Sequence, residues 1–113
     1  MNSAEHRLQA QCTQWFWNTY PEHRRMLLCI DNNSSNRVEG NMKKALGVVR
    51  GASDLILIGE FCVVFIELKV GDNKQSEYQK DFQEKVKARG HLYKIIRSFE
   101  EFKEAIWKTI GQF

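Results

Sequence analysis

The sequence predicts a small α/β domain in which helices flank a mixed sheet, with the element order α-β-β-β-α-β-α. Two short apolar runs meet at Gly59-Glu60-Phe61, which is typical of a β-hairpin. Two later segments open with capping-box patterns and continue with helical periodicity. The apolar run between them completes a β-α-β unit, whose crossover is right-handed and whose strands are parallel. At 113 residues, we expect one domain spanning residues 1–113.

The N-terminal segment predicts a helix over residues 3–20, which Pro21 ends, followed by a strand over residues 26–30. Glu5 falls near the inward side of this helix. It has two interpretations: an acid that complements the helix N-terminus, or an extra carboxylate delivered to the hairpin. The aromatic residues near the end of the helix either pack in the core or lie at a subunit contact; they are Trp15, Phe16, Trp17 and Tyr20.

Residues 31–51 predict a loop, because the apolar periodicity fades and asparagine, serine and glycine accumulate. The segment is also basic, and Glu39 is its one glutamate. It is either an ordinary solvated loop or a flexible segment that contacts phosphates. We favour the second interpretation because the segment leads directly into Asp54. Its basic residues are Arg37, Lys43, Lys44 and Arg50.

The second half of the chain alternates helix and strand after the hairpin. Ser76 and Gln79 form an S-x-x-Q capping box at a helix start, and Gly90 is a plausible stop. A strand follows over residues 92–96, and Ser98 with Glu101 opens the closing helix. The expected buried stripes are Tyr78, Phe82 and Val86 in the first helix, and Phe102, Ile106 and Ile110 in the second.

Composition is that of an ordinary globular protein, with 42% hydrophobic and 27% charged residues. A net charge of +3 permits binding to a polyanion without requiring it. The absence of a long apolar run argues against a membrane span, and the first residues lack the layout of a secretory signal. The three cysteines are widely spaced in apolar surroundings and are expected to be reduced core residues. We therefore expect a cytoplasmic location.

Three charged residues interrupt the apolar hairpin: Asp54, Glu67 and Lys69. Side chains alternate along a strand, so Glu67 and Lys69 share a face, and Asp54 can lie across from them. A Glu-x-Lys pair is often an exposed ion pair worth about 0–1 kcal/mol. This pair, however, ends the most apolar strand of the chain beside a strand that begins with an acid. That setting favours a functional site.

The functional interpretation is a site for Mg²⁺ or Mn²⁺, because both cations prefer hard oxygen ligands such as the carboxylates of Asp54 and Glu67. Such a cation polarises a phosphoryl oxygen and makes a bound water nucleophilic, while Lys69 can orient that water or neutralise developing charge. Gln79 either supports this chemistry or only caps its helix. The combination suits hydrolysis of a phosphodiester.

Asp54 followed by Glu67-Leu68-Lys69 resembles the signature of the PD-(D/E)XK nuclease superfamily. The segments 51–55 and 65–69, with the later Gln79 and Gly90, resemble the VRR-Nuc family within it. Glu5 and Asn32 extend the resemblance over most of the chain. One departure is Ser53, where the family usually has a proline that shapes the turn.

This resemblance implies a restriction-endonuclease-like α-β-β-β-α-β core, followed here by a C-terminal helix. It also implies divalent-metal-dependent cleavage of DNA by residues matching Asp54, Glu67 and Lys69. It also implies that the Leu68 backbone carbonyl helps to ligate the metal and that Glu5 and Gln79 support the site. Compact members are similar to phage and bacterial enzymes that form homodimers and act on branched DNA such as four-way (Holliday) junctions. No nucleotide cofactor is expected. The candidate DNA-binding residues are Arg37, Lys43, Lys44, Arg50 and Lys74.

Two other functions remain open from the sequence. The chain could be a non-catalytic nucleic-acid-binding module of the same fold, acting as a subunit of a larger complex. It could also be a small α/β protein whose hairpin charges form only a structural ion pair. The complete set of two acids and a lysine favours the nuclease over both.

Overall fold

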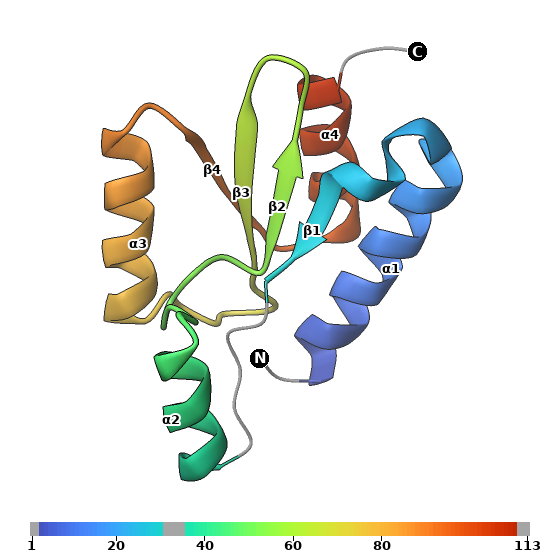
Figure 1. Cartoon of the computed structure of the whole chain (residues 1–113). Helices are drawn as coiled ribbons and strands as arrows, with labels where there is room; N and C mark the ends of the chain where they lie inside the picture. The colour runs from blue at the N-terminus through green and yellow to red at the C-terminus, as the bar shows by residue number, and fades with distance from the viewer. Residues whose placement is uncertain (1–2, 31–35, 111–113) are drawn as a thin grey trace.

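In the computed structural model, a four-stranded mixed sheet lies between helices (Figure 1). The structure describes residues 3–30 and 36–110, so Asn32, which the resemblance singled out, lies outside the described residues. The strands are β1 (Leu27–Cys29), β2 (Leu55–Ile58), β3 (Val63–Leu68) and β4 (Leu92–Ile96). The helices are α1 (Ser3–Thr19), α2 (Arg37–Ala45), α3 (Glu77–Ala88) and α4 (Phe99–Ile110), with a 3₁₀ helix at Pro21–Met26.

The strand order in the sheet is β1-β2-β3-β4, with antiparallel β1/β2 and β2/β3 pairs and a parallel β3/β4 pair. The predicted hairpin, the parallel crossover and the order of the core elements are therefore confirmed. Figure 1 shows α3 on one face of the sheet and α1 with α4 on the other. The predicted end of the first helix at Pro21 is also correct, since α1 stops at Thr19.

The core lies between the sheet and the α1/α4 layer. Side chains of β3 alternate as predicted: Val64, Ile66 and Leu68 are at most 1% exposed and belong to this core. Phe16 of α1 and Phe102 of α4 are fully buried beside them. The other face of β3 carries Phe65, Glu67 and then Lys69, so the charged residues lie on the α3 side. Other core members include Cys12, Tyr20, Leu55, Leu57, Ile96 and Ile106.

The predicted loop over residues 31–51 was wrong for part of its length, because Arg37–Ala45 forms α2. Asn36 caps this helix by accepting a hydrogen bond from the Glu39 N–H at 2.8 Å. Val38, Met42 and Leu46 recur at helical spacing, but the face is exposed rather than buried. Gly40 within the helix weakens the local signal by about 1 kcal/mol relative to alanine. Because of these features, the sequence did not predict that residues 37–45 form a short amphipathic helix.

Three smaller expectations need correction. Tyr78 does not continue the buried stripe of α3, since it is 52% exposed. Of the cysteines, Cys12 is buried, but Cys29 is exposed and Cys62 only partly buried; all three are free thiols. The second capping box is half formed, because the Glu101 N–H donates to the Ser98 hydroxyl at 3.1 Å as predicted. The Glu101 carboxylate, however, accepts from the Arg97 N–H at 2.9 Å instead of the Ser98 N–H. Among the described residues, no helix combines the length and apolarity needed to cross a membrane.

Candidate active site

Asp54 lies directly before β2, where the antiparallel register brings it across from the end of β3. Leu55 pairs with Ile66, and the Asp54 N–H donates to the Ile66 carbonyl at 3.0 Å. Its side-chain Oδ2 accepts from the Leu68 N–H at 2.6 Å. The Asp54 carboxylate is thereby fixed at the backbone of Leu68, the residue between Glu67 and Lys69. The predicted approach of Asp54 to the end of the hairpin is confirmed.

Ser53 explains why the turn before Asp54 forms without the usual proline. Its fully buried hydroxyl donates to the Leu55 carbonyl at 3.2 Å and so bridges across Asp54. A hydrogen bond of this kind holds a turn locally, as a side-chain-to-backbone alternative to a fixed proline ring. The serine therefore constrains the backbone around Asp54 through a hydrogen bond, at the position where the family pattern has a proline.

Glu67 is only 1% exposed and is held through one of its two oxygens. Oε1 accepts from the Tyr93 hydroxyl at 2.5 Å and from the Gln75 side-chain amide at 3.0 Å. Oε2 is buried and has no hydrogen-bond partner within residues 3–30 and 36–110. A buried carboxylate oxygen without a donor is costly, so Oε2 fits a position at which a cation binds.

Burial raises the pKa of the Asp54 carboxyl to about 6. The Leu68 N–H lowers this pKa, the negative charges of Glu67 and Glu5 raise it, and the Lys69 ammonium lowers it. These electrostatic effects indicate that the four ionisable groups share one environment. Lys69 is only 9% exposed, and its backbone N–H donates to the Ile96 carbonyl at 3.0 Å. The three residues predicted to carry the chemistry therefore meet at one end of the hairpin.

Glu5 reaches this region from α1 and is 5% exposed. Its Oε2 accepts from the Asn73 side chain at 2.9 Å and from the Val70 N–H at 3.4 Å. Glu5 therefore ties α1 to the turn that follows β3, and the interpretation of Glu5 as a simple complement to its helix N-terminus is incomplete. These hydrogen bonds occupy one of the two carboxylate oxygens of Glu5.

A comparison with solved structures finds a match over the whole chain. The structure of a protein described as a VRR_NUC domain protein aligns with a TM-score of 0.78 and 19% sequence identity, covering 100% of this chain and 94% of that one. The chain has the VRR-Nuc fold. No family model matches the sequence, and no curated protein matches it either. This fold places Asp54, Glu67 and Lys69 together at one end of the hairpin.

Gln79, at the position that resembles the VRR-Nuc glutamine, forms the capping box of α3 in this structure. Its Oε1 accepts from the Ser76 N–H at 2.8 Å, and its own N–H donates to the Ser76 hydroxyl at 3.2 Å. Of the two roles that the sequence left open, the structure shows the cap. A catalytic role for Gln79 would require its side chain to leave this cap and stays a prediction.

Three residues near Glu67 were missed by sequence reasoning: Gln75, Gln83 and Tyr93. Strand alternation offered a signal for Tyr93, because it pairs with Phe65 and so shares the face of Glu67. That signal needs the β3/β4 register, which the sequence alone does not provide. Gln75 is in a turn and Gln83 in the middle of a helix, where glutamine is common and carries no specific signal.

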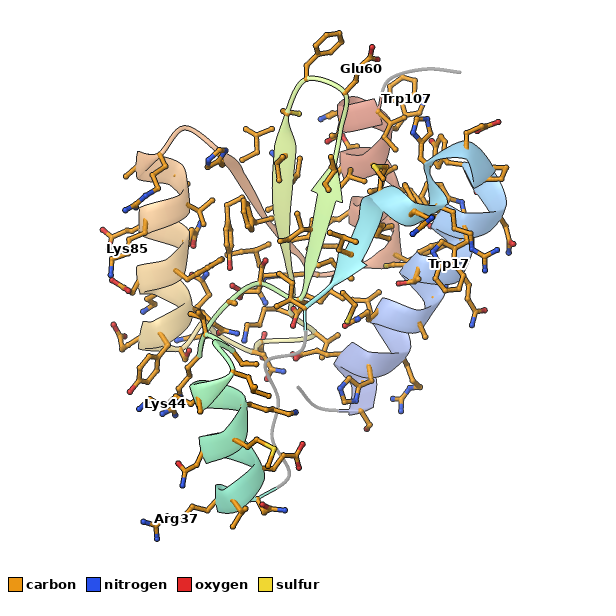
Figure 2. All side chains as sticks on the ribbon, viewed as in Figure 1. Trp17, Arg37, Lys44, Glu60, Lys85 and Trp107 are labelled. Carbon is orange, nitrogen blue, oxygen red and sulfur yellow. The ribbon has the colours of Figure 1, made fainter. Side chains whose placement is uncertain are left out.

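The basic residues predicted to bind DNA are spread over α2 and the neighbouring turns. Lys43 pairs with Glu39 at 3.0 Å and is only partly exposed, so it is less available than predicted. Figure 2 shows Arg37 at the far tip of α2 and Lys44 nearer to α3. Lys74 is exposed in the turn before α3. Helix α2 itself lies beyond the end of the sheet at which the candidate site is found (Figure 1).

Arg50 is held by α3 rather than free in a loop. Its guanidinium lies 4.2 Å from the centre of the Tyr78 ring, a cation–π contact. The adjacent Gly51 has φ +84°, and a Cβ there would come within 2.5 Å of the Tyr78 backbone. Only glycine allows this approach, which joins the segment before β2 to the start of α3. The contact places a fixed positive charge at the helix that follows the candidate site.

The donor set fits a hard divalent cation, although it is small. Within residues 3–30 and 36–110, no group of three or more histidine, cysteine, aspartate or glutamate side chains is arranged to hold a metal ion. The candidate ligands are instead two carboxylates, Asp54 and Glu67, beside the backbone of Leu68. Such a set suits Mg²⁺ or Mn²⁺, which bind through one or two carboxylates and keep several waters. The unpartnered Oε2 of Glu67 is the observation that supports this fit.

Proposed function

We propose that this protein is a divalent-metal-dependent endonuclease that hydrolyses phosphodiester bonds of DNA in the cytoplasm. The observation that carries the proposal is the state of Glu67. One oxygen is fixed by two donors, and the other is buried without a hydrogen-bond partner in the part of the chain that the structure describes. Asp54 and Lys69 share the environment of Glu67. A purely structural ion pair would satisfy the lysine and the glutamate with each other, and would not leave a buried carboxylate oxygen unpartnered.

Asp54 and Glu67 would hold Mg²⁺ or Mn²⁺, with the Leu68 carbonyl as a further proposed ligand. When bound, the cation would supply Lewis-acid activation at the phosphodiester. Lys69 would orient the attacking water or neutralise negative charge as it develops on the phosphate. Glu5 would support the site mainly by fixing the turn after β3, because its Oε2 already accepts two hydrogen bonds there.

The basic side chains around this end of the sheet would position the DNA backbone. Arg37, Lys44, Arg50 and Lys74 would contact phosphates, with Lys43 contributing once it leaves Glu39. Such contacts carry no sequence information by themselves. We therefore propose that the substrate is selected by shape, and that branched DNA such as a four-way junction is preferred.

A homodimer would match a two-fold symmetric junction, since each protomer would supply one active site. An apolar surface that would suit a second copy is formed by Val38 and Met42 on α2 and by Leu46 directly after it, which are 61–77% exposed. Of the aromatic residues considered for such a contact, Phe16 and Tyr20 are buried in the core of one chain instead. The α2 face is therefore the better candidate for the subunit contact.

The test compares a labelled four-way junction with a linear duplex of the same sequence, each in Mg²⁺, in Mn²⁺ and in chelator. We expect metal-dependent cutting of the junction, absent in chelator, with two symmetric incisions that report a paired enzyme. Lys69→Ala, purified in parallel, controls for a contaminating nuclease.

Equal cutting of both DNAs would contradict the preference for branched DNA and leave the nuclease in place. Incisions on one strand only would contradict the paired enzyme. Binding of both DNAs without cutting in either metal would contradict the nuclease and favour the non-catalytic binding module.

A further inference from the structure

Four side chains form a hydrogen-bonded network at the buried carboxylate of Glu67, which Gln83 of α3 reaches through Gln75 and Tyr93 of β4 contacts directly. The Gln75 amide nitrogen donates to Glu67 Oε1 at 3.0 Å and to Gln83 Oε1 at 2.8 Å. The Tyr93 hydroxyl donates to the same Glu67 oxygen at 2.5 Å. A primary amide carries two N–H donors, so both donors of Gln75 can be used in this arrangement.

We propose that Gln75, Gln83 and Tyr93 are positioning residues that hold Glu67 with Oε2 turned toward the cation, an inference that rests on the proposed metal site. A carboxylate can present either oxygen, or both, to a cation. Here two donors converge on Oε1 while Oε2 receives none. The protein therefore fixes the carboxylate in one orientation before any ligand arrives, which is how outer-shell partners orient metal ligands.

Gln83 acts through Gln75. An ionised carboxylate only accepts hydrogen bonds, so Gln75 must turn its nitrogen, and not its oxygen, toward Glu67. The Gln83 oxygen stabilises that orientation because it accepts from the same nitrogen. Without Gln83, the Gln75 amide is free to rotate and present its oxygen, which would repel Glu67.

Tyr93 is well placed to remain a donor. Its side chain is buried on the α3 face of β4, and its ring contacts that of Phe82 with centroids 6.2 Å apart. A tyrosine hydroxyl carries one O–H, and here it is directed at Glu67 Oε1.

The experiment measures the Kd for Mn²⁺ alone, in the full-length protein without DNA. We expect Tyr93→Phe and Gln75→Leu each to weaken Mn²⁺ binding by about 10-fold, the lower end of the effect known for outer-shell partners. Tyr93→Phe keeps the ring packed against Phe82. Tyr78→Phe and Gln14→Leu make the same chemical changes at exposed positions and should leave the Kd for Mn²⁺ unchanged.

A second set of variants separates positioning from stability. Gln83→Leu should weaken Mn²⁺ binding in the wild-type background but have no further effect in Gln75→Leu, because Gln83 acts only through Gln75. Gln83→Glu keeps an acceptor for Gln75. Unlike Gln83→Leu, it should therefore bind Mn²⁺ at least as tightly as wild type does. A role in packing alone would lower the melting temperature in chelator and leave the Kd for Mn²⁺ unchanged.

The outcomes distinguish this inference from the proposed function. Weaker Mn²⁺ binding in Tyr93→Phe and Gln75→Leu, with rescue by Gln83→Glu, supports the positioning role. A wild-type protein that binds Mn²⁺ together with variants that bind it equally well overturns the positioning role alone. A wild-type protein that binds no Mn²⁺ overturns the metal site and the positioning role with it.

Discussion

Replacing Lys69 with alanine is expected to lower the rate of DNA cleavage by about 10²–10³-fold while leaving the fold and metal binding intact. This magnitude is typical for loss of one group that stabilises charge developing in a transition state. Lys69 is 9% exposed and lowers the pKa of the Asp54 carboxyl, so its charge acts in the low-dielectric environment of the two acids. Removing a positive charge there should leave Mn²⁺ binding as tight as in wild type, or tighter.

The measurement combines single-turnover cleavage, a Mn²⁺ titration and a denaturant melt on Lys69→Ala. Lys85→Ala is the matched control, because Lys85 pairs with Asp81 on the exposed side of α3 (Figure 2). If Lys69 were only half of a structural ion pair, its removal would destabilise the protein by about 3–5 kcal/mol, as for other buried pairs. A large loss of stability with no loss of cleavage per folded molecule would contradict the catalytic role.

Asp54→Asn is expected to abolish cleavage and, in the metal-free protein, to raise the free energy of unfolding above pH 6. The pKa of Asp54 is raised from 3.8 to about 6, first by burial and then by Glu67 and Glu5. Between these two pH values, the folded protein holds a proton that the unfolded chain has lost. Stability therefore falls as the pH rises from about 4 to about 6, and above pH 6 the full penalty remains.

The size of this penalty follows from the shift of about two pH units, which corresponds to about 3 kcal/mol. An asparagine removes the charge and keeps an oxygen that can accept from the Leu68 N–H. Denaturant unfolding in chelator should show Asp54→Asn to be more stable than wild type at pH 8, with the difference vanishing near pH 4. The control Asp81→Asn loses an exposed ion pair and should change stability by less than about 1 kcal/mol. If Asp54→Asn were no more stable than wild type at pH 8, the result would contradict the claim that the buried, ionised Asp54 carboxylate destabilises the folded protein.

Most of the fold was predictable because its signals are local. The hairpin follows from two apolar runs around a glycine turn, and the face that carries Glu67 follows from strand alternation. The cap of α3 follows from Ser76 and Gln79, and the structure shows both of its hydrogen bonds. Asp54 and Glu67 are distant in the sequence, yet the hairpin alone brings them together.

What could not be predicted depends on tertiary contacts. Helix α2 was missed because its apolar stripe remains exposed, and Asn36 and Gly40 also occur in ordinary loops. Tyr93 reaches Glu67 only through the register between β3 and β4, which is set by packing of the whole sheet. Gln75 reaches it because the turn after β3 folds back, a shape that Glu5 and Asn73 help to fix.

The central claim is that Glu67 holds a divalent cation through an oxygen that the protein leaves unpartnered. The most direct test is a Mn²⁺ titration of wild type and of Glu67→Gln without DNA, followed by competition with Mg²⁺. We predict saturable binding by wild type that Mg²⁺ displaces, and a loss of more than about 100-fold in affinity in Glu67→Gln, since a ligand matters more than its outer-shell partners. Equal Mn²⁺ affinities in the two proteins would contradict the claim.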